Sequence, residues 1–255
     1  MIITDTHTHL YSEAFDDDRD EMMQRAFSLG VTRFFVPAID SSYTKAMFKL
    51  KKEYPNNVFL MMGLHPTSVK ENFHQEIKLV KKMLEENTYY GIGETGIDLY
   101  WDKTFYREQL EAFKTQVQWA VEKKLPIVIH CRESLDETIN LVHDLHDGEL
   151  YGIFHCFTGD IGQAKKIIDM GFYLGIGGVS TFKNGGLDKV IPHIGLENLV
   201  LETDSPYLAP APNRGKRNDP SLLPYIAERI ATLKNCDPEE IKEVTTENAL
   251  RIFKL

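Results

Sequence analysis

The chain contains few cysteines and no long apolar run, and both absences limit the kind of protein it can be. Its 255 residues include three cysteines, Cys131, Cys156 and Cys236, with no Cys-x-x-Cys spacing. This odd number argues against a disulfide framework and against a cysteine zinc cluster. No stretch approaches the roughly 18 uninterrupted apolar residues of a membrane helix, and the first residues lack the pattern of a signal peptide. We therefore expect a cytoplasmic protein without membrane contact.

Positive charge is scarce as well, because 29 Lys and Arg residues stand against 38 Asp and Glu, a net charge of −9. A protein of this charge does not hold nucleic acid by a general basic face, so any binding of phosphate has to be organised locally. No Gly-Lys-Ser or Gly-Lys-Thr sequence occurs, which argues against a P-loop nucleotide site. With 42% hydrophobic and 26% charged residues, the composition is that of a globular protein and excludes disorder.

What the chain does contain is eight short runs of β-branched and apolar residues, each followed by a longer segment with a helical pattern. The expected strand ends are His7 to His9, Pro37, His65, Glu94, His130, His155, Gly177 and Asp204. Neighbouring ends lie 22 to 36 residues apart, close to the ~30 residues of a βα unit. The pattern predicts one α/β domain over residues 1–255, a closed (β/α)8 TIM barrel. An open doubly wound sheet is the alternative.

Two helices have clear signals at the level of single residues. Apolar side chains spaced at one helical face predict an amphipathic helix over residues 107–123. Near the other end of the chain, Asp237 and Pro238 supply an N-cap and a proline at the first helical position. A closing helix is therefore expected to run from there toward Phe253.

Most of the expected strands end in residues that can bind a metal ion. These residues are His7, His9, Glu94, His130, His155 and Asp204, and His65 ends another strand. In a barrel the C-terminal ends of all strands meet at one face, where catalytic groups are placed. His7 and His9 are two residues apart, so their side chains leave the same face of a strand. The pattern predicts a metal centre at the mouth of the barrel.

Four imidazoles and two carboxylates are enough for two divalent ions if Glu94 bridges them. One ion would then take His7, His9 and Asp204, and the other His130 and His155. Positions left open for water mark a catalytic site, in which a metal-activated water is the nucleophile and Asp204 the general base. Imidazole ligands suit Zn, Ni or Fe, whereas carboxylate and phosphate contacts suit Mg or Mn, so the ion is left open.

The alternation of side chains along a strand predicts the orientation of residues beside the candidate ligands. Glu202 lies two residues before Asp204, so we expect it to point the same way and to orient a metal-bound histidine. Cys131 and Cys156 directly follow His130 and His155. Their thiols are therefore expected to face the helical layer as inert core groups.

Several further residues could contact a substrate near the strand ends. Arg132 has a planar guanidinium suited to phosphate, with an ion pair to a carboxylate as the alternative. The Pro- and Gly-containing segment 206–220 is expected to be an active-site loop, and it carries the densest basic cluster of the chain, Arg214, Lys216 and Arg217. Phe157 and Tyr207 could stack on bases, or could pack at the rim of the barrel.

Seven motifs in this order and spacing resemble those of the TatD-related metal-dependent hydrolases, a branch of the amidohydrolase superfamily of (β/α)8 enzymes. They are DTHTHL at 5–10, GLHP at 63–66, GIGETGID at 91–98, HCRES at 130–134, FHCFTG at 154–159, ETDSPYL at 202–208 and NALRIF at 248–253. The resemblance covers nearly the whole chain. One departure is Tyr11, at a place where the family usually has Asp or Asn.

The resemblance implies a divalent-metal-dependent hydrolase, with family members described as deoxyribonucleases that remove nucleotides from DNA ends. It implies metal-ligand positions at His7, His9, Glu94, His130, His155 and Asp204, a pocket histidine at His65, and magnesium for activity. The expected substrate is DNA, at single-stranded 3′ ends, or a small phosphoester. Two alternatives stay open: hydrolysis of an amide, lactone or ester at the same binuclear site, and a noncatalytic metal-binding scaffold.

Overall fold

Eight parallel strands form the centre of the molecule in a computed structural model that describes residues 2–255. The strands are β1 (Ile3–Asp5), β2 (Val31–Val36), β3 (Val58–Leu60), β4 (Ile92–Asp98), β5 (Ile127–Arg132), β6 (Gly152–Phe154), β7 (Tyr173–Ile176) and β8 (Leu199–Leu201). They pair in sequence order as two groups, β1 to β3 and β4 to β8. Every pair is parallel, because a segment with helical turns separates each strand from the next.

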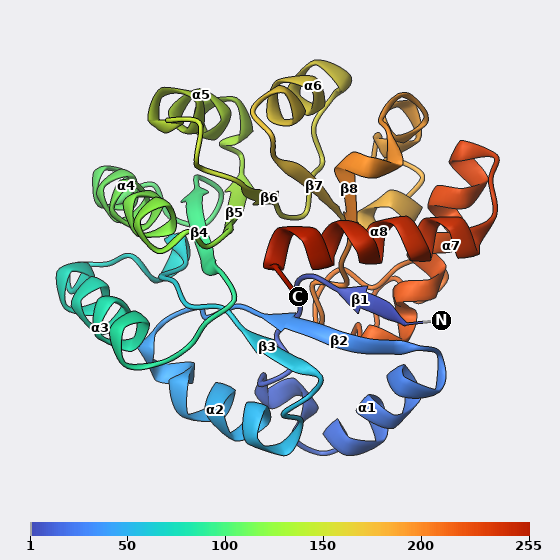
Figure 1. Cartoon of the computed structure of the whole chain (residues 1–255), viewed down its shortest axis with the longest axis horizontal. Coiled ribbons are helices and arrows are strands. Elements are labelled where there is room, and N and C mark those ends of the chain that lie inside the picture. The colour runs from blue at the N-terminus through green and yellow to red at the C-terminus, as the bar shows by residue number, and fades with distance from the viewer. Residues whose placement is uncertain (1) are drawn as a thin grey trace.

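Backbone contacts join the two groups into a ring. Between β3 and β4, Met62 forms a parallel bridge with Ile92. Between β8 and β1, the Thr6 amide donates to the Leu201 carbonyl at 3.0 Å, just past the end of β1. The predicted (β/α)8 barrel is therefore confirmed, and the open sheet is excluded. Figure 1 shows the strands at the centre with helices around them.

The helices outside the ring are α1 (Arg19–Ser28), α2 (Thr44–Glu53), α3 (Phe73–Glu86), α4 (Tyr106–Lys123), α5 (Leu135–Leu145), α6 (Ile161–Asp169), α7 (Leu223–Lys234) and α8 (Pro238–Phe253). Helix α4 matches the predicted span to within one residue at its start. Helix α8 begins as predicted, because the Asp237 carboxylate accepts from the Glu239 amide and Pro238 occupies the first turn.

The connection from β7 to β8 departs from the predicted repeat. In place of an α-helix, the chain forms four short 3-10 turns between Gly178 and Asn198. This segment contains Gly185, Gly186 and Pro192, and glycine and proline are the residues least suited to a helix interior. None of the helices in residues 2–255 is long and apolar enough to cross a membrane.

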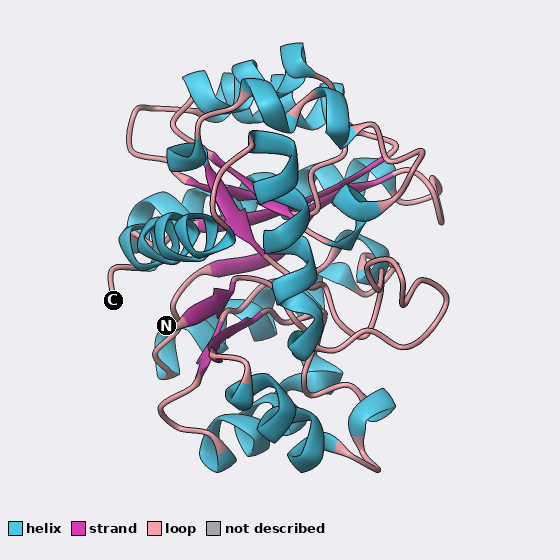
Figure 2. Cartoon of the chain, turned by 90° about the vertical axis from the view of Figure 1, so that its right-hand side faces the viewer, coloured by secondary structure: helices cyan, strands magenta, loops and turns pink. Residues whose placement is uncertain are grey.

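Helix α8 closes one end of the barrel. Its residues Ala249, Ile252 and Phe253 pack with apolar side chains of four strands and of the residue directly after β3, namely Phe35, Val128, Ile153, Val200 and Met61. The rings of Phe253 and Phe35 stack with centroids 3.6 Å apart. Figure 1 shows α8 lying across the middle of the ring, and Figure 2 shows long loops projecting from the opposite side. The end that α8 leaves open is the one at the C-terminal ends of the strands.

Candidate metal centre

Glu94 on β4 lies at the centre of the ionisable residues at this open end. Its side chain is 3% exposed, and Oε2 lies 3.0 Å from His7 Nε2 and 3.6 Å from His9 Nε2. Its other oxygen, Oε1, lies 2.8 Å from His130 Nδ1 and 3.3 Å from His65 Nε2. One carboxylate from the middle of the chain thus contacts histidines that follow β1 and β3 or lie on β5.

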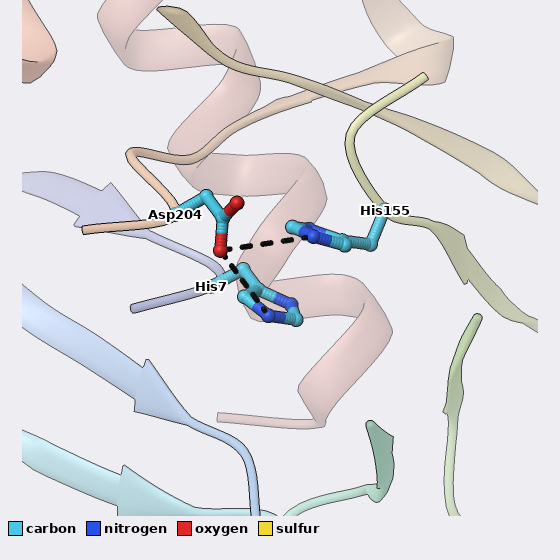
Figure 3. A group of neighbouring side chains, drawn as sticks. All are labelled: His7, His155 and Asp204. Atoms are coloured by element: carbon cyan, nitrogen blue, oxygen red, sulfur yellow. Dashed lines mark ion pairs between the residues drawn. The ribbon is translucent and has the colours of Figure 1, made fainter. Parts of the chain in front are cut away.

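Asp204 supplies the second carboxylate, from the segment after β8. Its Oδ1 lies 4.0 Å from His7 Nε2 and 3.9 Å from His155 Nε2, as Figure 3 shows, and 3.6 Å from His9 Nε2. The rings of His7 and His155 stack with centroids 3.5 Å apart. The structure therefore brings together all six residues that the sequence singled out, although they come from five parts of the chain.

Three groups of side chains that contain Glu94 or Asp204 have donor atoms within 4.8 Å of one another: His7, His155 and Asp204; His7, His9 and Glu94; and His65, Glu94 and His130. The division expected from sequence stays a prediction. His155 Nε2 lies near Asp204 and His7, and it also lies 3.8 Å from Glu94 Oε1, the oxygen that is 2.8 Å from His130 Nδ1. The donors are imidazole nitrogens and carboxylate oxygens, a set that suits Zn, Fe, Ni or Mn.

The charge balance of the site fits a bound cation. Burial acts to raise the pKa of Glu94, yet the imidazoles of His65, His7 and His155 hold it well below the usual range, so the carboxylate is ionised. Within residues 2–255, no Lys or Arg nitrogen lies within 4.0 Å of either carboxylate. His7 Nδ1 is buried without a hydrogen-bond partner. Divalent ions would neutralise these buried carboxylates where no basic side chain does.

Glu202 occupies the place that strand alternation predicted for it. It is fully buried, its Oε1 lies 2.9 Å from His155 Nδ1, and the same oxygen accepts from the Cys156 amide at 2.6 Å. Although burial acts to lower the pKa of His155, the carboxylates of Glu202 and Glu94 raise it to about 10. Gly175 on β7 leaves room for this side chain, because a Cβ there would lie 2.2 Å from Glu202 Oε2.

Asp98 is a site residue that sequence reasoning missed. It is 1% exposed, and its Oδ2 lies 2.9 Å from His130 Nε2, the ring nitrogen that faces away from Glu94. Its Oδ1 accepts from the backbone amides of Tyr100 and Trp101 at 2.9 and 3.0 Å. The sequence predicted that the fourth strand ends at Glu94, but β4 continues to Asp98. Its even spacing from Glu94 along one strand was the signal available.

A cavity of about 890 Å³ lies over these residues and opens to solvent. Four of the predicted substrate contacts line it: His65, Arg132, Tyr207 and Arg214. The segment 206–220 contributes seven lining residues, Pro206, Tyr207, Leu208, Ala209, Arg214, Gly215 and Lys216, which places it at the site as expected of an active-site loop. Trp101, in the loop after β4, lines the cavity as well and was not anticipated.

Phe157 does not line this cavity, so the expectation that its ring stacks on a substrate base is corrected. It is 3% exposed and belongs to the hydrophobic core. The reason is local, because the Phe157 amide donates to the Gly175 carbonyl at 3.0 Å and holds this segment against β7.

The expected orientation of two cysteines also needs correction. Both Cys131 and Cys156 are partly exposed and line the cavity, whereas the sequence predicted that their thiols face the helical layer. Cys156 follows the end of β6 and has a φ of +48°, so strand alternation does not extend to it. Burial raises the pKa of Cys131 to about 12 and raises that of Cys156, so both thiols stay protonated at neutral pH.

The basic residues near the opening divide into paired and unpaired side chains. Arg217 forms an ion pair with Asp18 at 2.6 Å and does not line the cavity. The Arg132 guanidinium lies over the Tyr100 ring, 4.0 Å from its centroid, and that of Arg214 lies 4.4 Å from the Phe182 centroid. Of the ion pairs formed by residues 2–255, none involves Arg132 or Arg214. The alternative prediction, an ion pair between Arg132 and a carboxylate, is therefore wrong.

A (β/α)8 barrel with histidines and carboxylates at the C-terminal ends of its strands defines a class of metal-dependent hydrolases. Comparison with known families is consistent with this class, because the profile of the TatD related DNase family matches residues 4–254. The chain belongs to the TatD related DNase family. Family membership and the placement of the His, Glu and Asp side chains together make it a metal-dependent hydrolase.

Similar proteins cover the chain from end to end. It is 37% identical over 255 residues to the uncharacterized metal-dependent hydrolase YabD of Bacillus subtilis, with 100% of both chains covered. It is 32% identical to the 3′-5′ ssDNA/RNA exonuclease TatD of Salmonella typhimurium, with 98% of both covered. Among solved structures, the TatD homolog YjjV of Escherichia coli matches with a TM-score of 0.92 and 25% identity, covering 99% of this chain and 98% of that one.

Proposed function

We propose that this hydrolase is a metal-dependent deoxyribonuclease that cleaves phosphodiester bonds at DNA ends, with single-stranded 3′ ends as its substrate. The observation that carries the proposal is the charge at the cavity. Arg132, Arg214 and Lys216 line it, and none of them forms an ion pair with another of residues 2–255. In a chain of net charge −9, three unpaired cations beside a metal centre are suited to a substrate with several phosphates.

The ions in this proposal are two divalent cations that share Glu94. The residues that would hold them are His7, His9, Glu94, His130, His155 and Asp204, with His65 at the edge of the site. Mg or Mn would serve for activity, and Zn, Ni or Fe could occupy the same donors. When bound, such ions polarise a phosphoryl oxygen and lower the pKa of water.

Asp204 is the residue we assign as general base. Burial acts to raise its pKa, but the imidazole of His9, 3.6 Å from Oδ1, and the charges of His155 and His7 lower it below its usual value. The carboxylate is therefore ionised at neutral pH and able to accept the proton of the attacking water. It also lines the cavity, where a substrate phosphate would lie.

The cationic side chains would act on the substrate backbone. Arg132 and Arg214 each present a planar guanidinium, a shape that binds two phosphate oxygens at once. Lys216 adds a single flexible charge in the same loop as Arg214. These contacts would hold the strand and neutralise part of its charge, leaving the reacting phosphate over Glu94.

The test uses metal-loaded protein and single-stranded DNA labelled at either the 3′ or the 5′ end. We expect release of the 3′ label at the first cleavage and stepwise shortening of the 5′-labelled strand, with activity at least ~100-fold lower in Glu94→Gln and in Asp204→Asn. Lys82→Gln, which removes a cation paired with Glu86 on α3, away from the cavity, is the control and should keep full activity.

Two outcomes would overturn the proposal. If wild type releases no nucleotide with any divalent ion, or if the two site variants match it, the deoxyribonuclease assignment is wrong. If the wild type hydrolyses a neutral lactone or ester but not DNA, and Arg132→Gln leaves that turnover unaffected, the site works on carbonyl substrates instead.

A further inference from the structure

The two tryptophans of the chain lie in opposite environments. Trp119 in α4 is 7% exposed, whereas Trp101 in the loop after β4 is 67% exposed and lines the cavity. Nine large hydrophobic residues are exposed among residues 2–255, and four of them, Tyr100, Trp101, Tyr207 and Leu208, lie in the loops after β4 and β8. Scattered apolar residues on a surface are ordinary, but a cluster at the mouth of a cavity marks a binding surface.

The loop that carries Trp101 is anchored on both sides of the indole. Before it, Asp98 accepts from the amides of Tyr100 and Trp101 while its other oxygen lies 2.9 Å from His130 Nε2. After it, the Asp102 carboxylate accepts from Lys70 Nζ at 2.8 Å. The backbone that carries the exposed ring is therefore anchored relative to the metal centre before any ligand arrives, which lowers the entropy lost on binding.

A cation is held against the same aromatic pair. The rings of Tyr100 and Trp101 are nearly perpendicular, with centroids 4.9 Å apart, and the Arg132 guanidinium lies 4.0 Å from the first and 5.3 Å from the second. Because Arg132 forms no ion pair with any of residues 2–255, its hydrogen-bond donors stay available to a ligand. Aromatic faces next to a free cation are the combination by which proteins hold single-stranded nucleic acid.

We propose that Trp101, with Tyr100 and Arg132, forms a stacking platform for an unpaired nucleobase of the bound strand, next to the nucleotide at the metal centre. The platform rests on the proposed function for the identity of its ligand and adds a base-binding site to it. A base inside a duplex has both faces covered by its neighbours, so only an unpaired base can stack on this indole. Arg132 would contact the phosphate of the nucleotide that carries this base.

The test uses fluorescence of the full-length, metal-loaded protein and a short phosphorothioate oligothymidylate that resists cleavage. Stacking of a base on an indole quenches its emission, and Trp101 is one of only two tryptophans. We expect quenching by the oligonucleotide in wild type and in Trp119→Phe, and its loss in Trp101→Phe. An oligonucleotide of equal length and charge that carries abasic sites should quench little.

The affinity change measures the platform itself. Stacking on one aromatic side chain corresponds to a rise in Kd of roughly 5- to 100-fold in Trp101→Ala for the thymidylate strand. The rise should be several-fold smaller for the abasic strand. That strand has no base to stack on Trp101, so removal of the indole takes away no stacking contact. Tyr225→Ala removes an aromatic that is 42% exposed on α7, away from the cavity, and should leave both affinities as in wild type.

The outcomes separate the platform from the proposed function. If Trp101→Ala weakens both strands equally, or weakens neither, the platform is wrong even where wild type degrades DNA. If wild type degrades no DNA but the base-dependent quenching and affinity loss remain, the platform stands and the nuclease assignment falls.

Discussion

At the scale of single residues, the centre is built from carboxylates placed against imidazoles. Glu94 is buried, and its ionised form persists because histidines from several strands surround it. Each of two histidines has a further carboxylate on its outer side: Glu202 lies beside His155 and Asp98 beside His130. Carboxylates in this position fix the ring orientation and increase the basicity of a metal-binding histidine.

The role of Asp98 can be tested with an isosteric change. Asp98→Asn keeps an oxygen that accepts from the amides of Tyr100 and Trp101, but replaces the oxygen facing His130 Nε2 with a group that cannot accept. We expect metal affinity and hydrolytic activity each to fall about 10- to 100-fold. Competition of a metal-binding dye against the protein gives the affinity, and an activity assay gives the rate.

A matched control comes from the same loop. Asp102→Asn changes a carboxylate that is 36% exposed and pairs with Lys70, not with a histidine. Its metal affinity should stay at the wild-type value. Unchanged metal affinity in Asp98→Asn would show that His130 needs no carboxylate to hold its orientation.

At the scale of elements, helix α8 acts as a plug for the barrel. Phe253 is 4% exposed and stacks on Phe35 of β2, so its ring completes the apolar layer below the metal centre. Phe253→Ala would remove this contact and leave a cavity, and we expect unfolding free energy to fall by about 3–5 kcal/mol. Urea unfolding followed by circular dichroism measures the change. Leu255→Ala, at an exposed residue two positions further along the chain, should change the unfolding free energy by less than about 0.5 kcal/mol. Equal effects of the two substitutions would contradict the role of α8 as a plug.

The loop after β8 is tied to the loop after β1 by a charged contact. Arg217 donates to both oxygens of Asp18, at 2.7 and 2.6 Å. The hydrogen bond from Arg217 is the main reason that the pKa of Asp18 is lower than its ordinary 3.8. A carboxyl with a lowered folded-state pKa stabilises the fold above its unfolded pKa, and this stabilisation is lost as pH falls through the folded-state value.

This sign gives a pH-dependent prediction. Because Asp18 is 26% exposed and solvent screens the pair, Asp18→Asn should cost no more than about 1 kcal/mol at pH 7. The difference from wild type should shrink as pH falls below 3.8, and unfolding by urea at pH 7, 5 and 3.5 would follow it. Asp188→Asn, at an exposed residue without an ion pair within residues 2–255, is the control. A difference that widens toward low pH would contradict the pair.

At the scale of the whole molecule, the two ends of the barrel have different roles. Helix α8 covers one opening, and the cavity with its unpaired cations lies at the other (Figures 1 and 2). The net charge of −9 is therefore compatible with an anionic substrate, because the cations that matter lie at the mouth.

Metal binding should stabilise the whole fold. Ions that bind only the native state add about 2.7 kcal/mol at 100 times their Kd, which corresponds to a rise in Tm of roughly 5–10 °C for a chain of this size. We expect this rise when Mn or Zn is added to chelator-treated wild type, and a much smaller one in Glu94→Gln. Calorimetry measures it, and an equal rise in both proteins would place the ions elsewhere.

Most of the architecture could be predicted from the sequence because it depends on local patterns. The spacing of apolar runs predicted eight βα units, and the cap at Asp237 predicted the start of α8. The end of β4 could not be predicted, since polar residues inside a barrel look like residues beyond a strand. Asp98 was missed for that reason. Phe157 was expected near the substrate and is buried, whereas Trp101, for which no role was expected, is exposed and lines the cavity. The burial of a loop aromatic depends on what the loop packs against.

The sequence by itself determined the order of the elements and the kinds of ligand at the ends of the strands, because both are written in periodicity and residue type. Only the tertiary structure decided which charges are paired. Arg217 meets Asp18 from 199 positions away, while Arg132 meets aromatic rings and stays free for a ligand. Pairing and burial depend on which segments come together when the ring of strands closes, and neither property is fixed by distance along the chain.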